Sequence, residues 1–547
     1  MVNKSGKPID SLHLNNTSPI TFTDITKLTW NGQNLTKILN DNVHKYYIYR
    51  LPKTMMPNDT VRVEMAIRAE YRGFPNEGID RSLVYNGTFF DLSIFPQMGY
   101  SSRGELSSEK YRKKYGLEIR DFEQPVRTDS LGLKTLLFND DGDFVSFKGT
   151  VSTESDQIAI LPGYLQREWT TTDGGTTRRH FEYKQDNLMD LFFSVVSARY
   201  AVKRDTVTLA NGKPLNIEIF HHPKHTYNVS HFTEGVKDAV QYCSKNFAPY
   251  QYRQLRILEF PRYASFAQSF PNTVPYSESF GWVADFSNID KTDYAYYVTA
   301  HEVAHQWWGH QITPSFTRGA NQISESMAEY SALMVLRQKY GNDVMQNFLK
   351  YALDRYLWGR GFETKSEETL LDNETGAYIW YQKGSMVLYA LQDYIGEEKL
   401  NAAFQAFAQK FAMKEQPPFA TTDDWYGFIK TATPDSLKYF VEDCFEKVTL
   451  YENKVKKAEY TDLGNGMSKV KITVDVKKLY YDKKGNQTAE GKGKDLIEIG
   501  IFTEDSKNAK GMKQKTPLYL QKHWLTAGEH TIELTVKGKP LKAGIDP

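Results

Sequence analysis

The chain of 547 residues contains only two cysteines, Cys243 and Cys444. Two thiols cannot build the disulfide framework that holds small secreted domains together, and they leave the cellular compartment open. Neither sign of charge is in excess, because 68 lysines and arginines balance 67 acidic residues to a net charge of +1. This balance gives no reason to expect a nucleic-acid partner or an acidic substrate.

Long apolar runs are also absent. A membrane-spanning helix needs roughly 18 or more apolar residues in succession, and the best candidate, residues 188–202, is interrupted by Asp190 and Arg199. The N-terminal stretch Met-Val-Asn-Lys-Ser-Gly-Lys-Pro lacks the apolar region of a secretory signal. The sequence as given therefore predicts a soluble polypeptide.

The hydrophobic pattern changes twice along the chain. Apolar residues alternate with charged ones over residues 61–67, as in a half-buried strand, and they do so again over residues 470–476. Between these regions, after a hairpin that turns at Asn211-Gly212, helical patterns dominate. We therefore expect an α+β multidomain protein with a β-rich N-terminal domain (1–205), a mainly helical catalytic domain (206–450) and a C-terminal β-sandwich (451–547). The lysine-rich stretch 477–494 reads as a long hairpin loop rather than a nucleic-acid-binding patch.

The most informative stretch is His301-Glu302-Val303-Ala304-His305. A helix is predicted around it, because Thr292-Asp293 can cap its start and residues 294–308 contain no glycine or proline. Histidines four residues apart share one helix face, so both imidazoles can reach a single zinc ion. Glu302 is rotated by about 100° around the helix axis from His301, so it can contact water at the metal. The alternative is two surface histidines at chance spacing.

A third ligand would distinguish a zinc site from two histidines at chance spacing, because a catalytic zinc usually has three protein ligands. Glu325 heads a second helical stretch and can be brought back against the first helix by an antiparallel crossing. Glu329, one turn further on, is the alternative ligand or else a partner for a histidine N–H. His310 falls at the wrong offset for the longer three-histidine motif. We expect one Zn²⁺ per chain, bound by His301, His305 and Glu325.

A further motif, Tyr381-Gln-Lys-Gly384, follows Glu325. With the zinc motif upstream, residues 206–450 resemble the catalytic domain of the aminopeptidase N-like zinc metallopeptidases, thermolysin relatives among the gluzincins. The resemblance implies a thermolysin-like catalytic domain that hydrolyses peptide substrates and removes N-terminal residues. It also implies that Glu302 is the general base and that Tyr381 donates a hydrogen bond to the developing oxyanion.

The same family binds the substrate's terminal amine through a G-x-M-E-N stretch, which corresponds here to residues 275–279 and retains Glu278. A second amine-binding acid of the family comes from its β domain. The corresponding segment here, Asn86-Gly-Thr-Phe-Phe90, contains no acid. We therefore expect Glu278 to bind the amine, and selection of a free amine to be weaker than in the family.

The set of motifs is also similar to a subgroup fused to bacterial ABC-transporter permeases, which implies an extracytoplasmic peptidase-like region attached to or partnered with a membrane portion. A catalytically weak or silent zinc- and peptide-binding module, or a scaffold that the metal only stabilises, is the alternative to an enzyme. Glu302 and Tyr381 favour the enzyme, because neither is needed to hold zinc.

Overall fold

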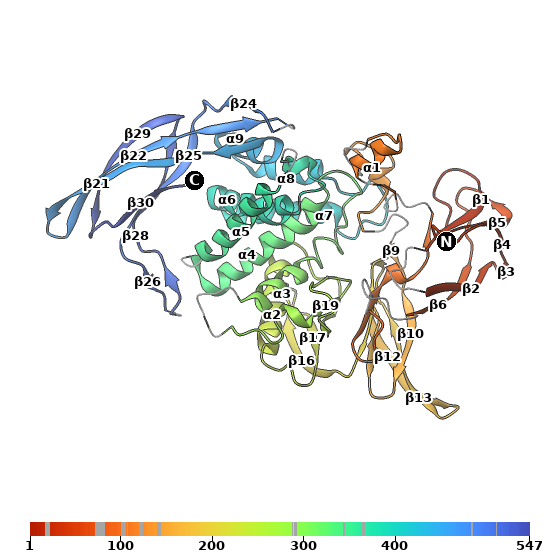
Figure 1. Cartoon of the computed structure of the whole chain (residues 1–547). Coiled ribbons are helices and arrows are strands. Elements are labelled where there is room, and N and C mark those ends of the chain that lie inside the picture. Colours follow the sequence, from red (N-terminus) through yellow and green to blue (C-terminus); the bar gives the residue numbers. More distant parts are fainter. Residues whose placement is uncertain are drawn as a thin grey trace.

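The computed structural model describes residues 1–16, 22–71, 82–99, 105–106, 108–119, 124–138, 144–286, 288, 293–342, 345–363, 367–482, 485–509 and 511–546. It is a multidomain structure with a β region at the N-terminus, a helical middle region and a β-rich region at the C-terminus. Figure 1 shows the two β regions on opposite sides of the helices. Among helices built from the described residues, none has the length and hydrophobicity that crossing a bilayer requires.

The N-terminal region consists of short antiparallel sheets. Their strand orders are β4-β5-β1-β8, β3-β2-β6, β10-β13-β12, β11-β15-β7 and β14-β9. The strands are β1 (Ile9–Asn15), β2 (Phe22–Trp30), β3 (Gln33–Asn34), β4 (Thr36–Asp41), β5 (Tyr46–Met55), β6 (Val63–Glu70), β7 (Thr88–Asp91), β8 (Gln97–Met98), β9 (Phe144–Val145), β10 (Lys148–Glu154), β11 (Ile158–Ile160), β12 (Tyr164–Asp173), β13 (Thr176–Lys184), β14 (Met189–Asp190) and β15 (Ser194–Ala198). The strand predicted from the alternation over residues 61–67 is β6, which pairs with β2. A short helix, α1 (Glu109–Lys114), lies between β8 and β9.

The middle region opens with a four-stranded sheet in the order β16-β17-β18-β19. These strands are β16 (Ala201–Thr208), β17 (Pro214–His221), β18 (Gln254–Phe260) and β19 (Thr273–Ser277). The predicted hairpin joins β16 to β17, while β17, β18 and β19 run parallel. The crossover from β17 to β18 passes through α2 (Val229–Asn246). The carboxyl ends of three neighbouring strands therefore lie at one edge of the sheet.

Helices pack over this sheet and surround one large apolar core (Figure 1). Its largest fully buried side chains include Trp282, Trp307, Trp308, Tyr330 and Trp425. The helices that follow β19 are α3 (Tyr294–Ala304), α4 (Met327–Tyr340), α5 (Met345–Gly361), α6 (Gly384–Ile395), α7 (Glu397–Phe411), α8 (Thr422–Ala432) and α9 (Lys438–Val441). Three π-helical segments adjoin them: η5 (Gln322–Ser326), η8 (Ile379–Lys383) and η10 (Glu442–Glu446).

The helix predicted around the histidines is α3, and it is shorter than predicted. The Asp293 side chain caps it by accepting a hydrogen bond from the backbone N–H of Tyr296 (3.0 Å), whereas Thr292 lies outside the described residues. The helix ends at Ala304, four residues before Trp308, and His305 is its C-cap. The N–H of His305 still donates to the carbonyl of His301 (3.2 Å), so both histidines keep their helical spacing although the chain turns away after them.

The C-terminal region contains two three-stranded sheets, β21-β22-β29 and β28-β25-β30, which share one apolar core. Its strands are β20 (Val448–Tyr451), β21 (Lys454–Gly464), β22 (Met467–Val476), β23 (Lys478–Tyr481), β24 (Gln487–Glu490), β25 (Asp495–Phe502), β26 (Ser506–Lys507), β27 (Lys513–Gln514), β28 (Pro517–Leu525), β29 (Gly528–Lys537) and β30 (Lys542–Ile545). The predicted strand at 470–476 is β22, whose Val470, Ile472 and Val474 are buried in that core.

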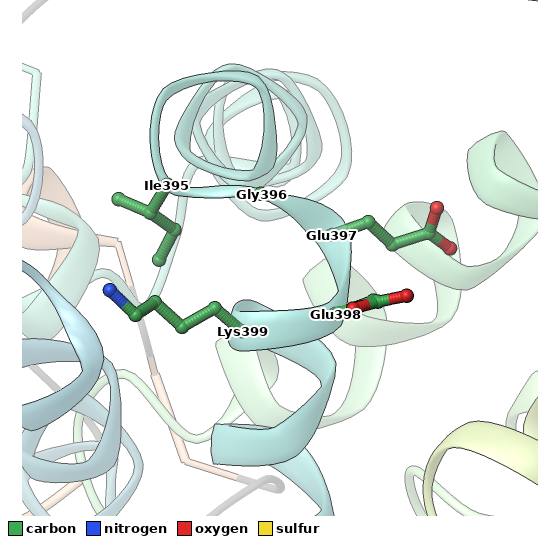
Figure 2. Close-up of a pocket in the computed structure, with 5 residues that line it drawn as sticks. All are labelled: Ile395, Gly396, Glu397, Glu398 and Lys399. Atoms are coloured by element: carbon green, nitrogen blue, oxygen red, sulfur yellow. The ribbon is translucent and has the colours of Figure 1, made fainter.

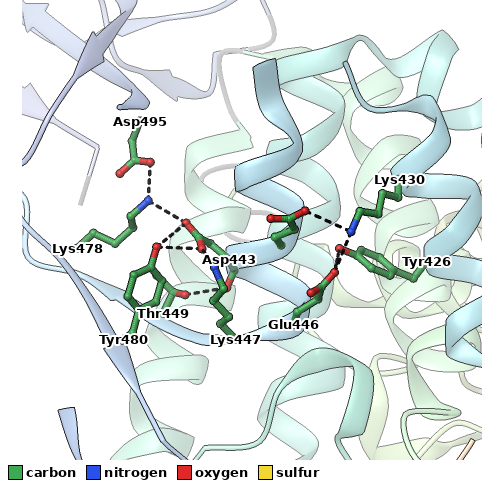
Figure 3. Close-up of polar contacts among 10 residues, drawn as sticks. Tyr426, Lys430, Asp443, Glu446, Lys447, Thr449, Lys478, Tyr480 and Asp495 are labelled. Atoms are coloured by element: carbon green, nitrogen blue, oxygen red, sulfur yellow. Dashed lines mark hydrogen bonds and ion pairs between the residues drawn. The ribbon is translucent and has the colours of Figure 1, made fainter. Parts of the chain in front are cut away.

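The stretch 477–494 is not simply a loop, because β23 and β24 pair within it and Lys478 is buried. The Lys478 ammonium donates to Asp443 (2.8 Å) in η10 and to Asp495 (2.7 Å) in β25. Figure 3 shows these contacts between the helical region and the C-terminal strands, with the Tyr480 hydroxyl also directed at Asp443. The predicted hairpin is therefore present as β23 and β24, but it is more than a loop, because Lys478 at its start is buried and ion-paired.

Candidate metal centre

The two histidines of α3 point toward each other across one turn of the helix. The Nε2 atoms of His301 and His305 are 3.0 Å apart, and both side chains are buried. The Nδ1 atom of His305 lies 2.9 Å from the carbonyl oxygen of Trp308. Because a carbonyl only accepts, Nδ1 carries the proton and donates, and the lone pair of Nε2 faces His301. The turn that ends α3 after Ala304 thus fixes the His305 tautomer.

Glu325 reaches the same point from η5, before α4. Its Oε2 atom lies 3.4 Å from Nε2 of His301 and 3.3 Å from Nε2 of His305. Helices α3 and α4 pack against each other, which brings Glu325 next to the two histidines. The glutamate lies in a π-helical turn, a local form that often occurs at functional sites.

The three residues fit a zinc ion. Their ligand atoms all lie within 4.8 Å of one another. Histidine and glutamate ligands bound tetrahedrally at about 2.0–2.2 Å lie roughly 3.3–3.6 Å apart, close to the observed spacings. The Glu325 Oε2 atom is buried and has no hydrogen-bond partner among the residues that the structure describes. A buried carboxylate oxygen without a donor is costly, and a cation would satisfy it.

Glu329 approaches His301 from the other side of the ring. Its Oε1 atom lies 3.4 Å from Nδ1 of His301, and its other oxygen accepts a hydrogen bond from the Tyr297 hydroxyl. Glu329 therefore faces the nitrogen that points away from His305 and Glu325. This position suits a residue that orients the His301 ring.

The charges at the centre depend strongly on one another. Burial opposes a charged imidazolium, but the carboxylates of Glu329 and Glu325 outweigh it and raise the pKa of His301 to about 9. Burial also opposes ionisation of Glu325, yet His305 and His301 hold the pKa of that carboxyl well below its usual range. The centre thus favours an ionised Glu325, which is the form that binds a metal ion.

Glu302 is buried on α3 beside these ligands. Burial raises the pKa of Glu302, and the nearby His301 and His305 only partly oppose this effect. A carboxyl whose pKa is raised toward neutrality is suited to accept a proton and return it.

Tyr381 lies in η8 with its ring centroid 6.0 Å from that of His301. Burial, followed by the charges of Glu325 and Glu302, raises the pKa of the Tyr381 phenol far above its usual value. The hydroxyl therefore stays protonated at neutral pH and can donate a hydrogen bond. The structure thus places Tyr381 beside His301.

The rest of the Tyr381-Gln-Lys-Gly384 motif holds this tyrosine in place. The Lys383 ammonium is buried and donates to Glu367, which also accepts from Arg360 (2.9 Å) and from the Tyr356 hydroxyl (2.8 Å). Burial alone would raise the pKa of Glu367, but Lys383 lowers it below its usual value. The motif lysine thus anchors η8 through a buried ion pair.

Two hollows lie near these helices. An apolar cavity beside Tyr381 and Glu329 is lined by Tyr297, Glu329, Leu333, Phe348, Tyr351, Ala352, Tyr381, Gln382 and Ser385. Figure 2 shows a second, open hollow at the turn between α6 and α7, lined by residues 395–399. The Glu397 side chain there pairs with Arg337 and accepts from Tyr242. This second hollow contains none of the metal-centre residues.

Glu278 lies outside the group formed by the zinc-ligand candidates. It follows β19 in a short 3₁₀ turn, η4 (Glu278–Phe280), and accepts from the backbone N–H of Arg262 (3.2 Å). It forms a second cluster with His225 and Glu259. Sequence reasoning missed these two partners. The signal for His225 was the run His221-His222-Pro-Lys-His225 directly after a strand, whereas nothing local singles out Glu259.

The part of the chain that carries this geometry is similar to known proteins. Residues 232–443 match the family model described as the peptidase family M1 domain. A probable aminopeptidase 1 of Sulfurisphaera tokodaii is 26% identical over 222 residues, covering 39% of this chain and 28% of the relative. Endoplasmic reticulum aminopeptidase 2 of Homo sapiens is 26% identical over 145 residues, covering 25% of this chain and 15% of the relative. The chain thus spans well under half the length of these curated relatives.

Solved structures share the fold. Aminopeptidase A of Legionella pneumophila, crystallised with aspartic acid, superposes with a TM-score of 0.56 at 16% identity, covering 97% of this chain and 54% of that one. A variant of the M1 zinc metallopeptidase from Deinococcus radiodurans gives a TM-score of 0.51 at 15% identity, covering 80% of this chain and 86% of that one. Residues 232–443, which carry the metal centre and Tyr381, are thus the part of the chain that is similar to the peptidase family M1 domain.

Proposed function

We propose that the protein is a zinc-dependent metallopeptidase that hydrolyses peptide bonds and acts as an aminopeptidase, removing N-terminal residues. The observation that carries this proposal is the convergence of three ligand atoms from His301, His305 and Glu325, beside a buried Glu302 and a protonated Tyr381. A structural zinc site would need neither of the last two residues. The match to the M1 domain and the aminopeptidase names of the curated relatives support the same activity.

His301, His305 and Glu325 would hold one Zn²⁺ per chain, with Glu329 orienting His301 and the Trp308 carbonyl orienting His305. The ion would supply Lewis acidity, lowering the pKa of a water molecule to about 7 and polarising the substrate carbonyl. Glu302 takes the proton of the attacking water and passes it to the leaving amine. Tyr381 donates a hydrogen bond to the oxygen that becomes negative in the transition state.

Glu278 is the proposed ligand for the α-ammonium of the substrate. Its side chain is 27% exposed, so a ligand can reach it. Tyr276, on the strand β19 that precedes Glu278, lies close enough to Glu302 for that carboxylate to contribute, after burial, to the raised pKa of Tyr276. Tyr276, two residues before Glu278, is thus near the residue proposed as the base.

We also propose the finer divisions of the fold: a β domain over 1–205, a thermolysin-like catalytic domain over 206–450 and a β-sandwich over 451–547. The helical crossover from β17 to β18 and the shared core of the two C-terminal sheets support them.

Attachment to an ABC-transporter permease is a separate proposal that rests on the resemblance of the motifs. The relatives and solved structures named above are described as aminopeptidases or M1 metallopeptidases. Finding the coding sequence of this chain in one reading frame with membrane-spanning segments would support it, and a frame without them would overturn it.

The test of the proposed function is a hydrolysis profile of the purified, zinc-loaded chain. Peptides of varied N-terminal residue are supplied with a free or an acetylated terminus, and products are followed by mass spectrometry. We expect stepwise loss of N-terminal residues that a chelator abolishes and added zinc restores. Cleavage only within peptides would overturn the aminopeptidase assignment, and no cleavage of any peptide would favour a silent binding module.

A further inference from the structure

Helix α5 leaves most of its surface uncovered. Of its 17 residues, all of which the structure describes, only Met345 and Phe348 are buried. Four exposed residues recur at steps of four, three and four along the chain, the last directly after the helix ends: Tyr351, Arg355, Trp358 and Phe362. Residues at this spacing share one face of an α-helix. We call these four residues the α5 stripe.

The outer half of the α5 stripe is a pair of exposed aromatic rings. Trp358 is 64% exposed and Phe362 is 68% exposed. Their rings pack edge to face with centroids 4.9 Å apart. Single apolar side chains on a surface are common, but contiguous apolar surface marks a binding site. The α5 stripe therefore differs from an ordinary solvated helix face.

Arg355 is the cation of the α5 stripe. Its guanidinium carbon lies 5.8 Å from the ring centroid of Tyr351 and 5.9 Å from that of Trp358. Within the part of the chain that the structure describes, Arg355 forms no ion pair, whereas the other three charged side chains of α5 are all paired. A guanidinium that rests on aromatic rings keeps its planar set of donors available for a carboxylate. The charge of the stripe thus favours a ligand with an acidic group.

The inner end of the α5 stripe reaches the metal centre. Tyr351 lines the apolar cavity that Glu329 and Tyr381 also line. Its ring packs edge-on against Tyr294, at the start of α3, with centroids 5.8 Å apart. Helix α5 also packs against η8, the segment that carries Tyr381. The stripe is thus continuous with the residues proposed for chemistry.

The length of the α5 stripe indicates which part of a peptide it fits. An α-helix rises about 1.5 Å per residue, so the step from Tyr351 to Phe362 covers about 16 Å. An extended peptide covers about 3.3 Å per residue, and about five residues therefore match the stripe. An aminopeptidase holds a single substrate residue on the amine side of the scissile bond. A peptide that lies along the whole stripe must therefore do so with the residues that follow this bond.

Two other occupants match the α5 stripe less well. Helices that bind anionic membrane surfaces carry several basic side chains beside their apolar face, whereas the stripe has one. A second copy of the chain would need a stable interface of about 20–30 residues on each side, far more than the stripe offers. Continuity with the cavity beside Tyr381 favours the peptide substrate.

We infer that the α5 stripe binds the part of a peptide substrate that follows the scissile bond. Arg355 pairs with an acidic residue of that part, and Trp358 and Phe362 contact the apolar side chains beyond it. This inference rests on the proposed aminopeptidase function and names its substrate class. The preferred substrates are peptides in which an acidic residue and then apolar residues follow the cleaved bond.

The experiment compares two substrates of the zinc-loaded chain. Leucine anilide ends at the scissile bond, whereas an amidated heptapeptide begins with leucine, has glutamate fourth, leucine fifth and seventh, and alanine elsewhere. The measured quantity is kcat/KM for the first cleavage of the heptapeptide, divided by kcat/KM for the anilide. Trp358→Ala and Phe362→Ala should each lower this ratio about tenfold. The loss should appear mainly in the KM of the heptapeptide, because the contact exists before and during the reaction.

Charge reversal tests Arg355 separately. Arg355→Glu should lower the ratio about fivefold, and a heptapeptide with lysine in place of glutamate should restore it. A general structural effect of the substitution would not produce this reciprocal exchange. The matched control is Tyr460→Ala, because Tyr460 is an aromatic residue of β21 in the C-terminal region and is 45% exposed. This control should leave the ratio unchanged.

An unchanged ratio in Trp358→Ala and Phe362→Ala would overturn the inference. So would binding to phosphatidylserine-containing vesicles, or dimer formation in sedimentation, that Trp358→Ala abolishes while the ratio stays constant. If the wild-type chain cleaves neither substrate, the proposed function fails, and the inference is decided by fluorescence anisotropy. The labelled heptapeptide should then bind the wild-type chain about tenfold more tightly than the Trp358→Ala variant, and equal binding would overturn the inference.

Discussion

Gly384 lies so close to Ser326 that a Cβ atom at position 384 would be 2.1 Å from the Ser326 hydroxyl oxygen. This contact joins the two π-helical segments that carry Glu325 and Tyr381, because Ser326 ends η5 and Gly384 directly follows η8. The Ser326 hydroxyl also donates to the Trp380 carbonyl (2.5 Å). The spacing between a proposed zinc ligand and the proposed oxyanion donor thus depends on a glycine.

Gly384→Ala should push the two segments apart and displace Tyr381 from the metal centre. A misplacement of about 1 Å can cost on the order of 10²-fold in rate, so kcat/KM should fall by about that factor while zinc stays bound. The matched control is Gly427→Ala in α8, where a Cβ would meet nothing within 4 Å. Activity equal to wild type in Gly384→Ala would show that the contact relaxes without moving Tyr381.

Glu325→Ala should remove most of the zinc, because one of three ligands is lost and two histidines alone bind weakly. Glu329→Ala removes the partner of His301 Nδ1 and the acceptor of the Tyr297 hydroxyl but no proposed zinc ligand, and it should weaken zinc binding by about 10–100-fold. Metal content after dialysis against graded chelator measures both. Zinc retained by Glu325→Ala but lost from Glu329→Ala would reverse the assignment of the two acids.

Glu302→Gln should keep the metal and the fold but reduce turnover by at least about 10²–10⁴-fold, because the amide cannot accept the proton of the attacking water. Steady-state hydrolysis and zinc analysis on the same preparation provide the measurement. Turnover near the wild-type rate in a fully zinc-loaded variant would mean that another group is the base.

Tyr381→Phe should retain zinc and lower kcat by about 10²–10³-fold, since one donor to the oxyanion is removed. The matched control is Tyr378→Phe. Tyr378 precedes η8, and its hydroxyl donates to Glu363 (3.2 Å), away from the residues assigned to chemistry. A larger loss in Tyr378→Phe than in Tyr381→Phe would show that the effect arises from the packing of η8.

Lys478→Met should destabilise the junction between the helical region and the C-terminal strands. It leaves Asp495 buried without its cation and Asp443 with Lys447 as its remaining cation, and breaking a buried ion pair costs about 3–5 kcal/mol. Denaturant unfolding should show the loss, whereas Lys469→Met, at an exposed pair with Glu533, should change stability little. Equal stability of both variants would mean that the Lys478 network adds nothing to the junction.

The sequence by itself determined the elements whose signals are local. Four-residue spacing placed His301 and His305 on one helix face, and alternation identified β6 and β22. The Tyr-x-Lys-Gly motif directed attention to Tyr381. The helix and strand signals depend on the 3.6-residue and two-residue periods of the backbone. Such a period can be recognised within a short stretch of sequence.

Tertiary structure decided what depends on distant partners. The early end of α3 follows from the turn that directs the Trp308 carbonyl to His305, and the burial of Lys478 follows from Asp443 and Asp495, which are 35 and 17 residues away. Similarly, His225, Glu259 and Glu278 meet because three parallel strands end at one edge. No local sequence pattern predicts contacts between residues that are far apart in the chain, because strand order and helix packing depend on the whole core.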